Sequence, residues 1–395
     1  MSYQFDRVPN RRNPARLNKW TWYSNDVLPL WVADMDFPAP KPILNELHKA
    51  VNQGVLGYEI PSAALKETVS ARMDYLYRWK VKAEAVVLTP GIVSAFNAAA
   101  RAFCTSRKGI MVQTPVYNEF HEVKNNVGIP QYNVPLMQSV NGNILHYEID
   151  WDLFKRTVKK ASVFLLCNPH NPLGIVFSRK DLLQMAEICI ENDVLIVSDE
   201  IHSELLLGDQ RFTPLAKLSS EIAKHTITLT APSKTFNVPG LFCGFSIIPN
   251  PELREQYVKV TEQLRLHVAS LGQFAARAAF SGQCDDWLHS LRVYLTANRD
   301  FLVDFVTERL PEIRMTIPDA TYLAWLDCNE LMKSGRIEGS PFDFFLKEAK
   351  VAFSDGKIFG KEGEGFVRLN FGCTRATLQK ALERVEKSLY RRKYG

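Results

Sequence analysis

Polar and reactive side chains stand at the ends of several short apolar runs in this 395-residue sequence. Asp199 directly follows one such run, where burying a carboxylate costs roughly several kcal/mol unless it meets a cation. Lys234 follows another run, and an amine held in a cleft can form an imine with an aldehyde. Tyr117 and Asn171 add an aromatic ring and an amide at two further run ends. Each residue alone has an ordinary structural explanation, but together they could form one reactive site.

The apolar runs indicate strands that alternate with helices. Unbroken apolar runs are typical of strands buried on both faces of a sheet. The alternation predicts an α/β fold in which helices cover a mostly parallel, mixed sheet. The expected strands are residues 85–89, 109–113, 162–167, 194–198 and 226–230, with helices at 94–103 and 180–192.

The rest of the chain predicts a second, smaller α+β domain. We expect an N-terminal arm with part of the small domain in residues 1–48, a large domain in residues 49–285 and the small C-terminal domain in residues 286–395. Residues 251–310 have helical patterns. The tail is expected to contain strands 320–327 and 366–370 and helices 342–350 and 375–390.

The N-terminal arm carries opposite charges in two places. Asp34 and Asp36 lie inside an apolar run, which indicates either a buried loop with paired acids or the wall of a site. We interpret the basic residues before them as a solvated arm rather than as a targeting signal. They are Arg7, Arg11, Arg12, Arg16 and Lys19.

Composition excludes several classes of protein. Hydrophobic residues make up 46% and charged residues 23%, as in ordinary globular proteins. The net charge of +5 is spread along the chain, so we expect neither a nucleic-acid nor a membrane partner. Seven cysteines without CxxC spacing argue against disulfides and zinc, so we expect reduced thiols, no metal and a cytoplasmic location. No apolar run approaches the roughly 18 residues of a membrane span.

The strand ends together match the chemistry of pyridoxal phosphate. Ligands of open α/β sheets bind beyond the carboxyl ends of the strands, where these residues should meet. Lys234 would form the imine, and Asp199 would keep the pyridine nitrogen protonated so that the ring withdraws electrons. Gly91 precedes a helix whose first backbone amides, those of Ile92 and Val93, suit a phosphate.

Six motifs, in order, resemble the fold-type I pyridoxal-phosphate enzymes of the aminotransferase class I/II group. Within that group the chain is most similar to the MalY/PatB type of cystathionine β-lyase, or C–S lyase. The resemblance implies a PLP-dependent transferase-like fold with a large PLP-binding domain. The motifs are Pro-Leu-Trp-Val-Ala-Asp-Met-Asp-Phe at 29–37, Thr-Pro-Gly-Ile-Val at 89–93, Thr-Pro-Val-Tyr at 114–117, Ser-Asp-Glu-Ile-His at 198–202, Lys-Thr-Phe-Asn-Val-Pro-Gly at 234–240 and Arg-Leu-Asn-Phe-Gly-Cys-Thr-Arg at 368–375.

The resemblance also implies roles for individual residues. Lys234 would be the Schiff-base lysine and the base that moves the Cα proton. Arg368 would hold the substrate α-carboxylate, a task suited to guanidinium. Tyr58 would reach the cofactor of the neighbouring subunit, which implies a homodimer with shared active sites. The implied cofactor contacts are Asp199 at the pyridine nitrogen, Asn171 and His202 near the phenolate oxygen, Tyr117 stacked on the ring, and Gly91, Ile92, Val93 and Ser233 at the phosphate. The implied substrate contacts are Arg368, Asn171, Ala33, Asp34 and Tyr58.

Three positions depart from the family pattern. Ala231 replaces a phosphate-binding serine, and Asn118 stands where some C–S lyases carry a second tyrosine after the stacking one. Phe242 replaces the arginine that many aminotransferases carry eight residues after the lysine, which weakens a generic aminotransferase interpretation. We therefore expect α,β-elimination of cystathionine, cysteine or another S-substituted cysteine to a thiol, pyruvate and ammonia. Transamination of an amino acid and a partner-binding regulatory role remain the alternatives.

Overall fold

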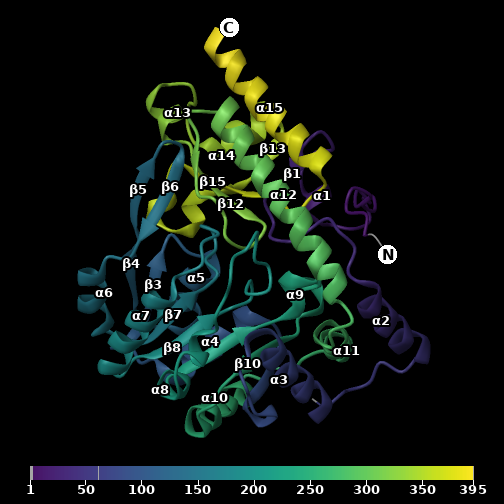
Figure 1. Ribbon diagram of the computed structural model, residues 1–395, viewed down its shortest axis with the longest axis vertical. Helices are drawn as coiled ribbons and strands as arrows, with labels where there is room; N and C mark the ends of the chain where they lie inside the picture. The colour runs from purple at the N-terminus through teal and green to yellow at the C-terminus, as the bar shows by residue number, and fades with distance from the viewer. Residues whose placement is uncertain (1–2, 61, 395) are drawn as a thin grey trace.

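A seven-stranded mixed sheet forms the lower part of the molecule in Figure 1. The computed structural model describes residues 3–60 and 62–394. The strand order is β2-β10-β9-β8-β7-β3-β4, and only β10 runs antiparallel to its neighbours. The strands are β2 (Val86–Thr89), β3 (Gly109–Thr114), β4 (Gln131–Pro135), β7 (Ala161–Cys167), β8 (Leu195–Asp199), β9 (Thr226–Thr230) and β10 (Gly244–Ile247).

Helices cover both faces of this sheet, which explains its apolar strands. Phe164 of β7 packs in one core cluster with side chains of α6 and α7, whereas its neighbours Val163 and Leu165 pack with α4 and α5 on the other face. Successive side chains of a strand point to opposite faces of the sheet, so neighbouring residues of β7 pack in different core clusters. The covering helices are α4 (Ile92–Phe103), α5 (Asn118–Val127), α6 (Trp151–Val158), α7 (Arg179–Glu191), α8 (Ser220–Lys224) and α10 (Pro251–Gln263).

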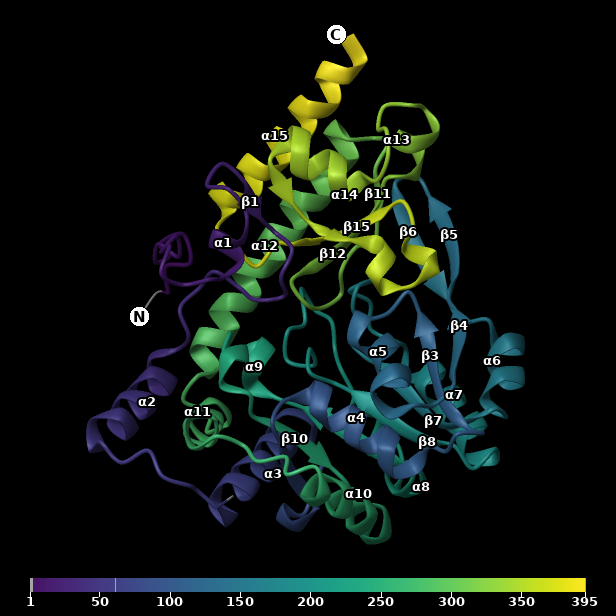
Figure 2. The ribbon, with the colours of Figure 1, turned by 180° about the vertical axis from the view of Figure 1, so that it is seen from behind.

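A second, six-stranded sheet lies in the upper part, as Figure 2 shows from behind. Its order is β14-β15-β12-β11-β6-β5. The strands are β5 (Met137–Asn141), β6 (Ile144–Glu148), β11 (Arg314–Met315), β12 (Leu323–Asp327), β14 (Ser354–Asp355) and β15 (Phe366–Asn370). The associated helices are α12 (Asp285–Arg309), α13 (Asn329–Lys333), α14 (Pro341–Phe344) and α15 (Arg375–Tyr394).

The β5–β6 hairpin joins this second sheet although it follows β4 of the first. Ile144 of β6 pairs with Met315 of β11. By sequence the hairpin belongs to the predicted large domain, residues 49–285, but it lies in the second sheet. The predicted division between residues 49–285 and 286–395 stays a prediction.

The N-terminal arm binds the second sheet before it reaches the helices at the base. It contains α1 (Lys19–Trp22) and β1 (Leu28–Pro29), and β1 pairs in parallel with β13 (Val351–Ala352). The chain then passes beside β15, where the backbone N–H of Asn370 donates a hydrogen bond to the carbonyl oxygen of Leu30. Beyond them, α2 (Lys41–Gln53) and α3 (Ala63–Tyr77) pack against α11 (Ser270–Phe280).

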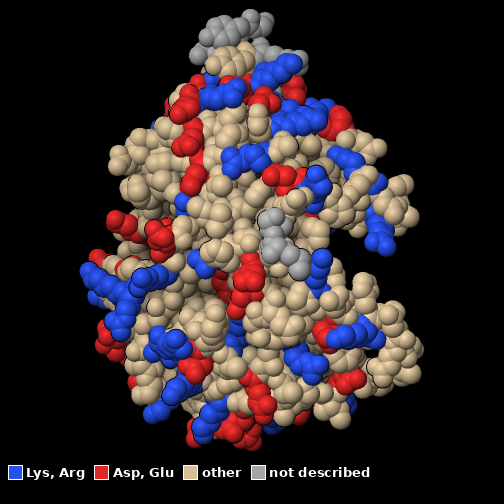
Figure 3. Space-filling model, turned by 45° about the vertical axis from the view of Figure 1, so that its right-hand side comes forward, with Lys and Arg blue, Asp and Glu red and all other residues tan. Residues whose placement is uncertain are grey.

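The predicted fold class is confirmed by this layered α/β arrangement. Basic and acidic side chains are interspersed over the face shown in Figure 3. All seven cysteines are free thiols, and Cys104 alone among them is partly exposed. Within residues 3–60 and 62–394, no helix has both the length and the apolar composition needed to cross a bilayer.

Candidate active site

A cavity of about 720 Å³ opens at the carboxyl ends of the central strands. Its lining comes from the turns after β2, β3, β7, β8 and β9, from residues 31–34 of the arm, and from Ser354, Ile358 and Arg368 in and near the second sheet. Every predicted site residue except Tyr58 lines this cavity: Ala33, Asp34, Gly91, Ile92, Val93, Tyr117, Asn171, Asp199, His202, Ser233, Lys234 and Arg368. The structure therefore brings these residues together, and their individual roles stay predictions.

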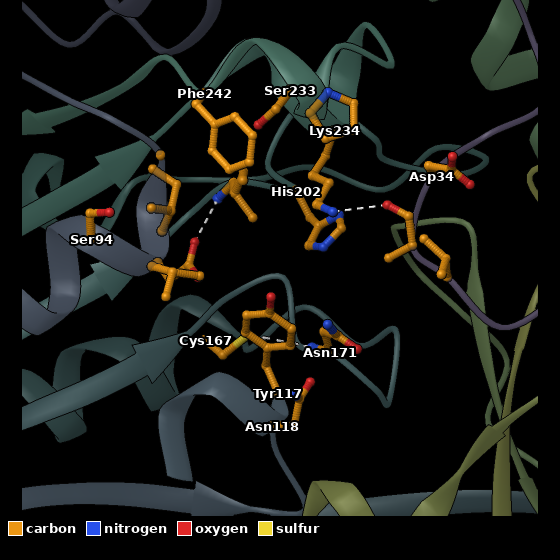
Figure 4. Close-up of a pocket in the computed structure, with 18 of the residues that line it drawn as sticks. Asp34, Ser94, Tyr117, Asn118, Cys167, Asn171, His202, Ser233, Lys234 and Phe242 are labelled. Carbon is orange, nitrogen blue, oxygen red and sulfur yellow. Dashed lines mark hydrogen bonds between the residues drawn. The ribbon is translucent and has the colours of Figure 1, made fainter. Parts of the chain in front are cut away.

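Lys234 lies on α9 (Pro232–Thr235), and its Nζ donates a 2.8 Å hydrogen bond to the carbonyl oxygen of Ala33. Figure 4 shows its side chain extending into the cavity between His202 and Asp34. Burial, reinforced by the positive charge of Arg368, lowers the pKa of Lys234 from 10.5 to about 8. Burial has this effect because it disfavours the charged ammonium form. A larger share of the amine is therefore neutral and nucleophilic near neutral pH.

Asp199 ends β8 as a buried carboxylate facing the cavity. Burial raises the pKa of Asp199 to about 7, against the opposing effects of the Ile201 amide and the charge of Lys234. The amide of Ile201 donates to its Oδ1 at 3.1 Å. A buried carboxyl group with raised proton affinity is suited to a cationic N–H partner, so this residue fits a pyridinium nitrogen.

Arg368 of β15 is buried and reaches the cavity from the second sheet. Its guanidinium donates to the Asn171 Oδ1 at 3.0 Å and to the Trp31 carbonyl at 2.9 Å, and its Nε has no partner. Burial lowers the pKa of Arg368 to about 10. Among the described residues, no carboxylate forms an ion pair with this guanidinium. A buried cation in this state fits an anionic group of a ligand, such as an α-carboxylate.

His202 is buried beside Lys234 and carries no charge at neutral pH. Burial, together with the positive charges of Lys234 and Arg368, lowers the pKa of His202 to about 3. Its Nδ1 is buried without a hydrogen-bond partner. A neutral imidazole with an unused nitrogen can exchange one hydrogen bond with a ligand oxygen.

The opposite wall supplies an aromatic ring and backbone amides. Tyr117 precedes α5, and Figure 4 shows its ring across the cavity from His202 and Lys234. Gly91 precedes α4 with φ of 88°, a left-handed value that glycine adopts without strain. The first amides of α4 have no partner within the helix, and they suit a phosphate. Phe242, with φ of 44°, lines the cavity where many aminotransferases carry arginine.

Residues 30–37 are held in place by two asparagine side chains from distant parts of the chain. Asn237 donates to the carbonyls of Met35 and Phe37, and Asn370 donates to those of Val32 and Asp34. These contacts fix the Ala33 carbonyl against Lys234. Neither asparagine is among the predicted site residues, although both belong to motifs of the resemblance.

The basic arm is not solvated throughout, and that expectation is wrong for Lys19 and Arg11. Lys19 is buried, and its Nζ lies 2.9 Å from Asp34 and 3.0 Å from Asp36. Arg11 pairs with the same two carboxylates at 2.7 and 3.1 Å. Burial alone would raise the pKa of Asp34, but the charges of Lys19 and Arg11 outweigh it and lower that pKa. Asp36 is therefore a buried, paired acid, and the partly buried Asp34 forms part of the site wall.

Tyr58 lies outside the cavity of its own chain. It is fully exposed in the loop between α2 and α3, whose Gly57 carbonyl accepts a hydrogen bond from Ser270 of α11. Its predicted contact across a subunit interface stays a prediction. Within the described ranges, no group of three or more His, Cys, Asp or Glu side chains is placed to hold a metal ion.

Comparison with known proteins agrees with this fold. The family model for aminotransferase class I and II matches residues 25–385. The chain is 38% identical over 368 residues to the cystathionine β-lyase PatB of Bacillus subtilis, covering 92% of this chain and 93% of PatB. The chain therefore belongs to the aminotransferase class I and II family. The resemblance to the MalY/PatB type of C–S lyase is confirmed.

Solved structures show the same architecture. Cystalysin from Treponema denticola, which contains pyridoxal 5′-phosphate, superposes with a TM-score of 0.91 at 31% identity, covering 99% of this chain and 100% of cystalysin. The PLP-bound C–S lyase from Staphylococcus hominis superposes with a TM-score of 0.90 at 29% identity, covering 98% of each chain. The predicted fold type is thereby confirmed over nearly the whole chain.

Proposed function

We propose that this protein is a pyridoxal-phosphate-dependent C–S lyase that converts S-substituted cysteines to a thiol, pyruvate and ammonia. The observation that carries the proposal is the meeting of Lys234, Asp199 and Arg368 in one cavity, with the pKa of the lysine lowered to about 8. The names of PatB and of the C–S lyase from Staphylococcus hominis support the reaction class.

The residues present fit the cofactor. Asp199 would pair with the pyridine nitrogen, Tyr117 would lie against the ring, and Asn171 and His202 would meet the phenolate oxygen. Ser233 and the first amides of α4 would hold the phosphate. When bound, pyridoxal phosphate withdraws the electron pair left on Cα and so makes the Cα proton removable.

The protein's own groups would supply the remaining steps. Arg368 holds the α-carboxylate and so orients the Cα–H bond relative to Lys234. The neutral Nζ of Lys234 takes the Cα proton, the Cβ–S bond breaks, and the same Nζ returns the proton to the departing sulfur. The released enamine reacts with water to give pyruvate and ammonia. Because the pKa of His202 is lowered to about 3, its imidazole does not take the proton from Lys234.

We also propose a homodimer in which Tyr58 completes the site of the second copy. The loop that carries Tyr58 exposes large apolar side chains that a subunit interface would bury, namely Val55, Leu56 and Ile60. Burying such a patch against an identical copy would give the symmetric contact typical of dimers. The free thiols support a reducing, cytoplasmic location.

One experiment separates elimination from transamination. The holoenzyme is incubated with S-methyl-L-cysteine or cystathionine, with and without an added α-keto acid, and pyruvate and free thiol are measured. The proposal predicts equal amounts of pyruvate and thiol without any keto acid. Amino-group transfer that requires a keto acid and releases no thiol would contradict it and favour the aminotransferase alternative.

A further inference from the structure

We propose that Tyr322 is a positioning residue: its hydroxyl holds the Ala33 carbonyl oxygen in place, and that oxygen orients the free amine of Lys234 for removal of the Cα proton. Tyr322 is not among the residues that line the cavity, so it acts through Ala33 and Lys234 rather than on the substrate itself. The inference rests on the proposed lyase function, because it needs Lys234 as the base. It adds a residue that lies outside the motifs of the resemblance.

The Ala33 carbonyl oxygen accepts hydrogen bonds from two side chains. Lys234 donates from Nζ at 2.8 Å, a bond drawn as a dashed line in Figure 4, and Tyr322 donates from its hydroxyl at 2.8 Å. A carbonyl oxygen has two lone pairs, so these two donors occupy both. Burial raises the pKa of Tyr322 well above its ordinary value, so the hydroxyl keeps the proton that it donates.

Among the described residues, this oxygen is the one hydrogen-bond partner of the Lys234 amine. The amine ends a flexible four-carbon stem, so a single fixed partner has a large effect on where it points. Removal of a proton requires a base that is close to the C–H bond and aligned with it, and a displacement of about 1 Å can cost roughly a hundredfold in rate. A fixed Ala33 oxygen therefore favours proton removal whenever the amine is not joined to the cofactor.

The Tyr322 side chain is itself closely packed. It is 1% exposed, and its ring lies edge-on to that of His202, with the ring centres 6.2 Å apart. Gly372 also lies against the ring. A Cβ added to Gly372 would approach the Tyr322 Cγ to 3.2 Å and the Met35 Cγ to 2.8 Å, so a larger residue would displace one of them. Tight packing on these sides leaves the phenol little freedom to move away from Ala33.

The backbone just before Tyr322 is strained, which is an independent observation. Thr321 has a φ of 74°, a left-handed value that is rare for a β-branched residue and costs free energy. Its N–H donates to the Leu205 carbonyl at 2.8 Å, and its Oγ1 accepts from the Leu323 N–H at 3.0 Å. The Leu205 N–H donates in turn to the His202 carbonyl at 2.9 Å. The turn that carries His202 thus holds Thr321 in this conformation, and such strain is typical of functional sites.

The first test compares Tyr322→Phe with Tyr257→Phe as the matched control. Tyr257 is similarly buried, and its hydroxyl also donates to a backbone carbonyl, that of Ala95 at 3.2 Å, but Tyr257 does not line the cavity. Each holoenzyme is mixed with saturating L-alanine in heavy water, and NMR measures exchange of the Cα proton. L-Alanine has no leaving group at Cβ, so this exchange measures proton removal without elimination.

Tyr322→Phe should slow this exchange roughly tenfold or more, whereas the dissociation constant of L-alanine from an absorbance titration should not change. Rates are divided by the amount of bound cofactor, so that a smaller folded fraction does not lower them. Tyr257→Phe should exchange at the wild-type rate. Wild-type exchange in Tyr322→Phe, or equal losses in both variants, would overturn the inference. A wild-type enzyme that exchanges L-alanine but forms no pyruvate from S-methyl-L-cysteine would instead contradict the lyase function.

The second test observes the Ala33 carbonyl in the apoprotein, where no reaction takes place. Ala33 and Asp34 form the only Ala-Asp pair in the sequence, so alanine labelled with ¹³C at the carbonyl and aspartate labelled with ¹⁵N give one NMR signal for this peptide bond. Hydrogen-bond donors deshield a carbonyl carbon. Tyr322→Phe and Lys234→Ala should therefore each move the signal upfield, and Tyr257→Phe should not. An unchanged signal in Tyr322→Phe would overturn the inference even if its exchange is slow.

Discussion

The side-chain amine of Lys234 and the hydroxyl of Tyr322 both donate 2.8 Å hydrogen bonds to the carbonyl oxygen of Ala33. This shared acceptor connects the N-terminal arm to the reactive amine, although the two lie 201 residues apart in sequence. The position of the amine therefore depends on residues 30–37, and these depend on the contacts of Asn237, Asn370 and Lys19. The arm is a structural part of the active site.

The lowered pKa of Lys234 predicts how uptake of the cofactor depends on pH. Only the neutral amine attacks an aldehyde, so the rate of pyridoxal-phosphate binding to the apoprotein should rise with pH and level off above about 8. Stopped-flow absorbance measures this rate, with Nα-acetyl-lysine as the reference amine. A rate that continues to rise to pH 10.5, the ordinary value for lysine, would contradict the prediction.

Asp199→Asn should lower the rate of pyruvate formation by roughly a hundredfold or more. The change removes the carboxylate charge that would pair with the pyridine nitrogen of the cofactor. Breaking such a buried pair costs about 3–5 kcal/mol. Glu200→Gln is the matched control, because Glu200 is equally buried but bonds to Ser198 and to the Leu215 amide outside the cavity. Similar losses in both variants would contradict the assigned role of Asp199.

Lys19→Met should lower the free energy of unfolding by about 3 kcal/mol, because it leaves the buried carboxylate of Asp36 and the partly buried one of Asp34 with Arg11 as their remaining cation. Lys49→Met is the control. Lys49 pairs with Glu46 on the surface, where loss of an ion pair should cost about 0.5 kcal/mol or less. Urea denaturation measures both changes, and equal midpoints for the two variants would contradict the prediction.

Mixing two inactive variants tests the shared site. Tyr58→Ala and Lys234→Ala subunits should each be inactive or nearly so. A mixed dimer contains one site with both residues intact, so random exchange should restore about a quarter of the wild-type activity. Light scattering verifies that dimers form. Mixed dimers without recovered activity would contradict a role for Tyr58 across the interface. Tyr75→Ala, at an exposed tyrosine on α3, serves as the control.

The strands that carry the site could be predicted because their burial is visible in the sequence. β3, β8 and β9 are buried at every residue, and a run of apolar and small polar side chains reports that burial directly. Their ends then place Tyr117, Asp199 and Lys234 at one edge of the sheet, which explains why these residues lie in one cavity. Ala33, Asp34 and Arg368 reach the same cavity from the arm and the second sheet.

Other elements leave no comparable pattern. Every residue of β5 is exposed, so its sequence contains no apolar alternation. β10 has four residues and follows β9 after only two short helical turns, at Pro232–Thr235 and Pro239–Leu241, so no alternation of strand and longer helix marks it in the sequence. Lys19 pairs with Asp34 and Asp36, and no periodic pattern in the sequence indicates this contact. Such contacts become visible only once the chain has folded.

The most direct test of the central claim locates the cofactor on the chain and links that position to the chemistry. The holoenzyme is reduced with borohydride and digested, and mass spectrometry identifies the modified peptide. The same preparation, before reduction, is assayed for pyruvate from S-methyl-L-cysteine. A single adduct on Lys234 is expected, and Lys234→Ala should lose both the adduct and pyruvate formation. An adduct on another lysine, or sustained pyruvate formation by Lys234→Ala, would contradict it.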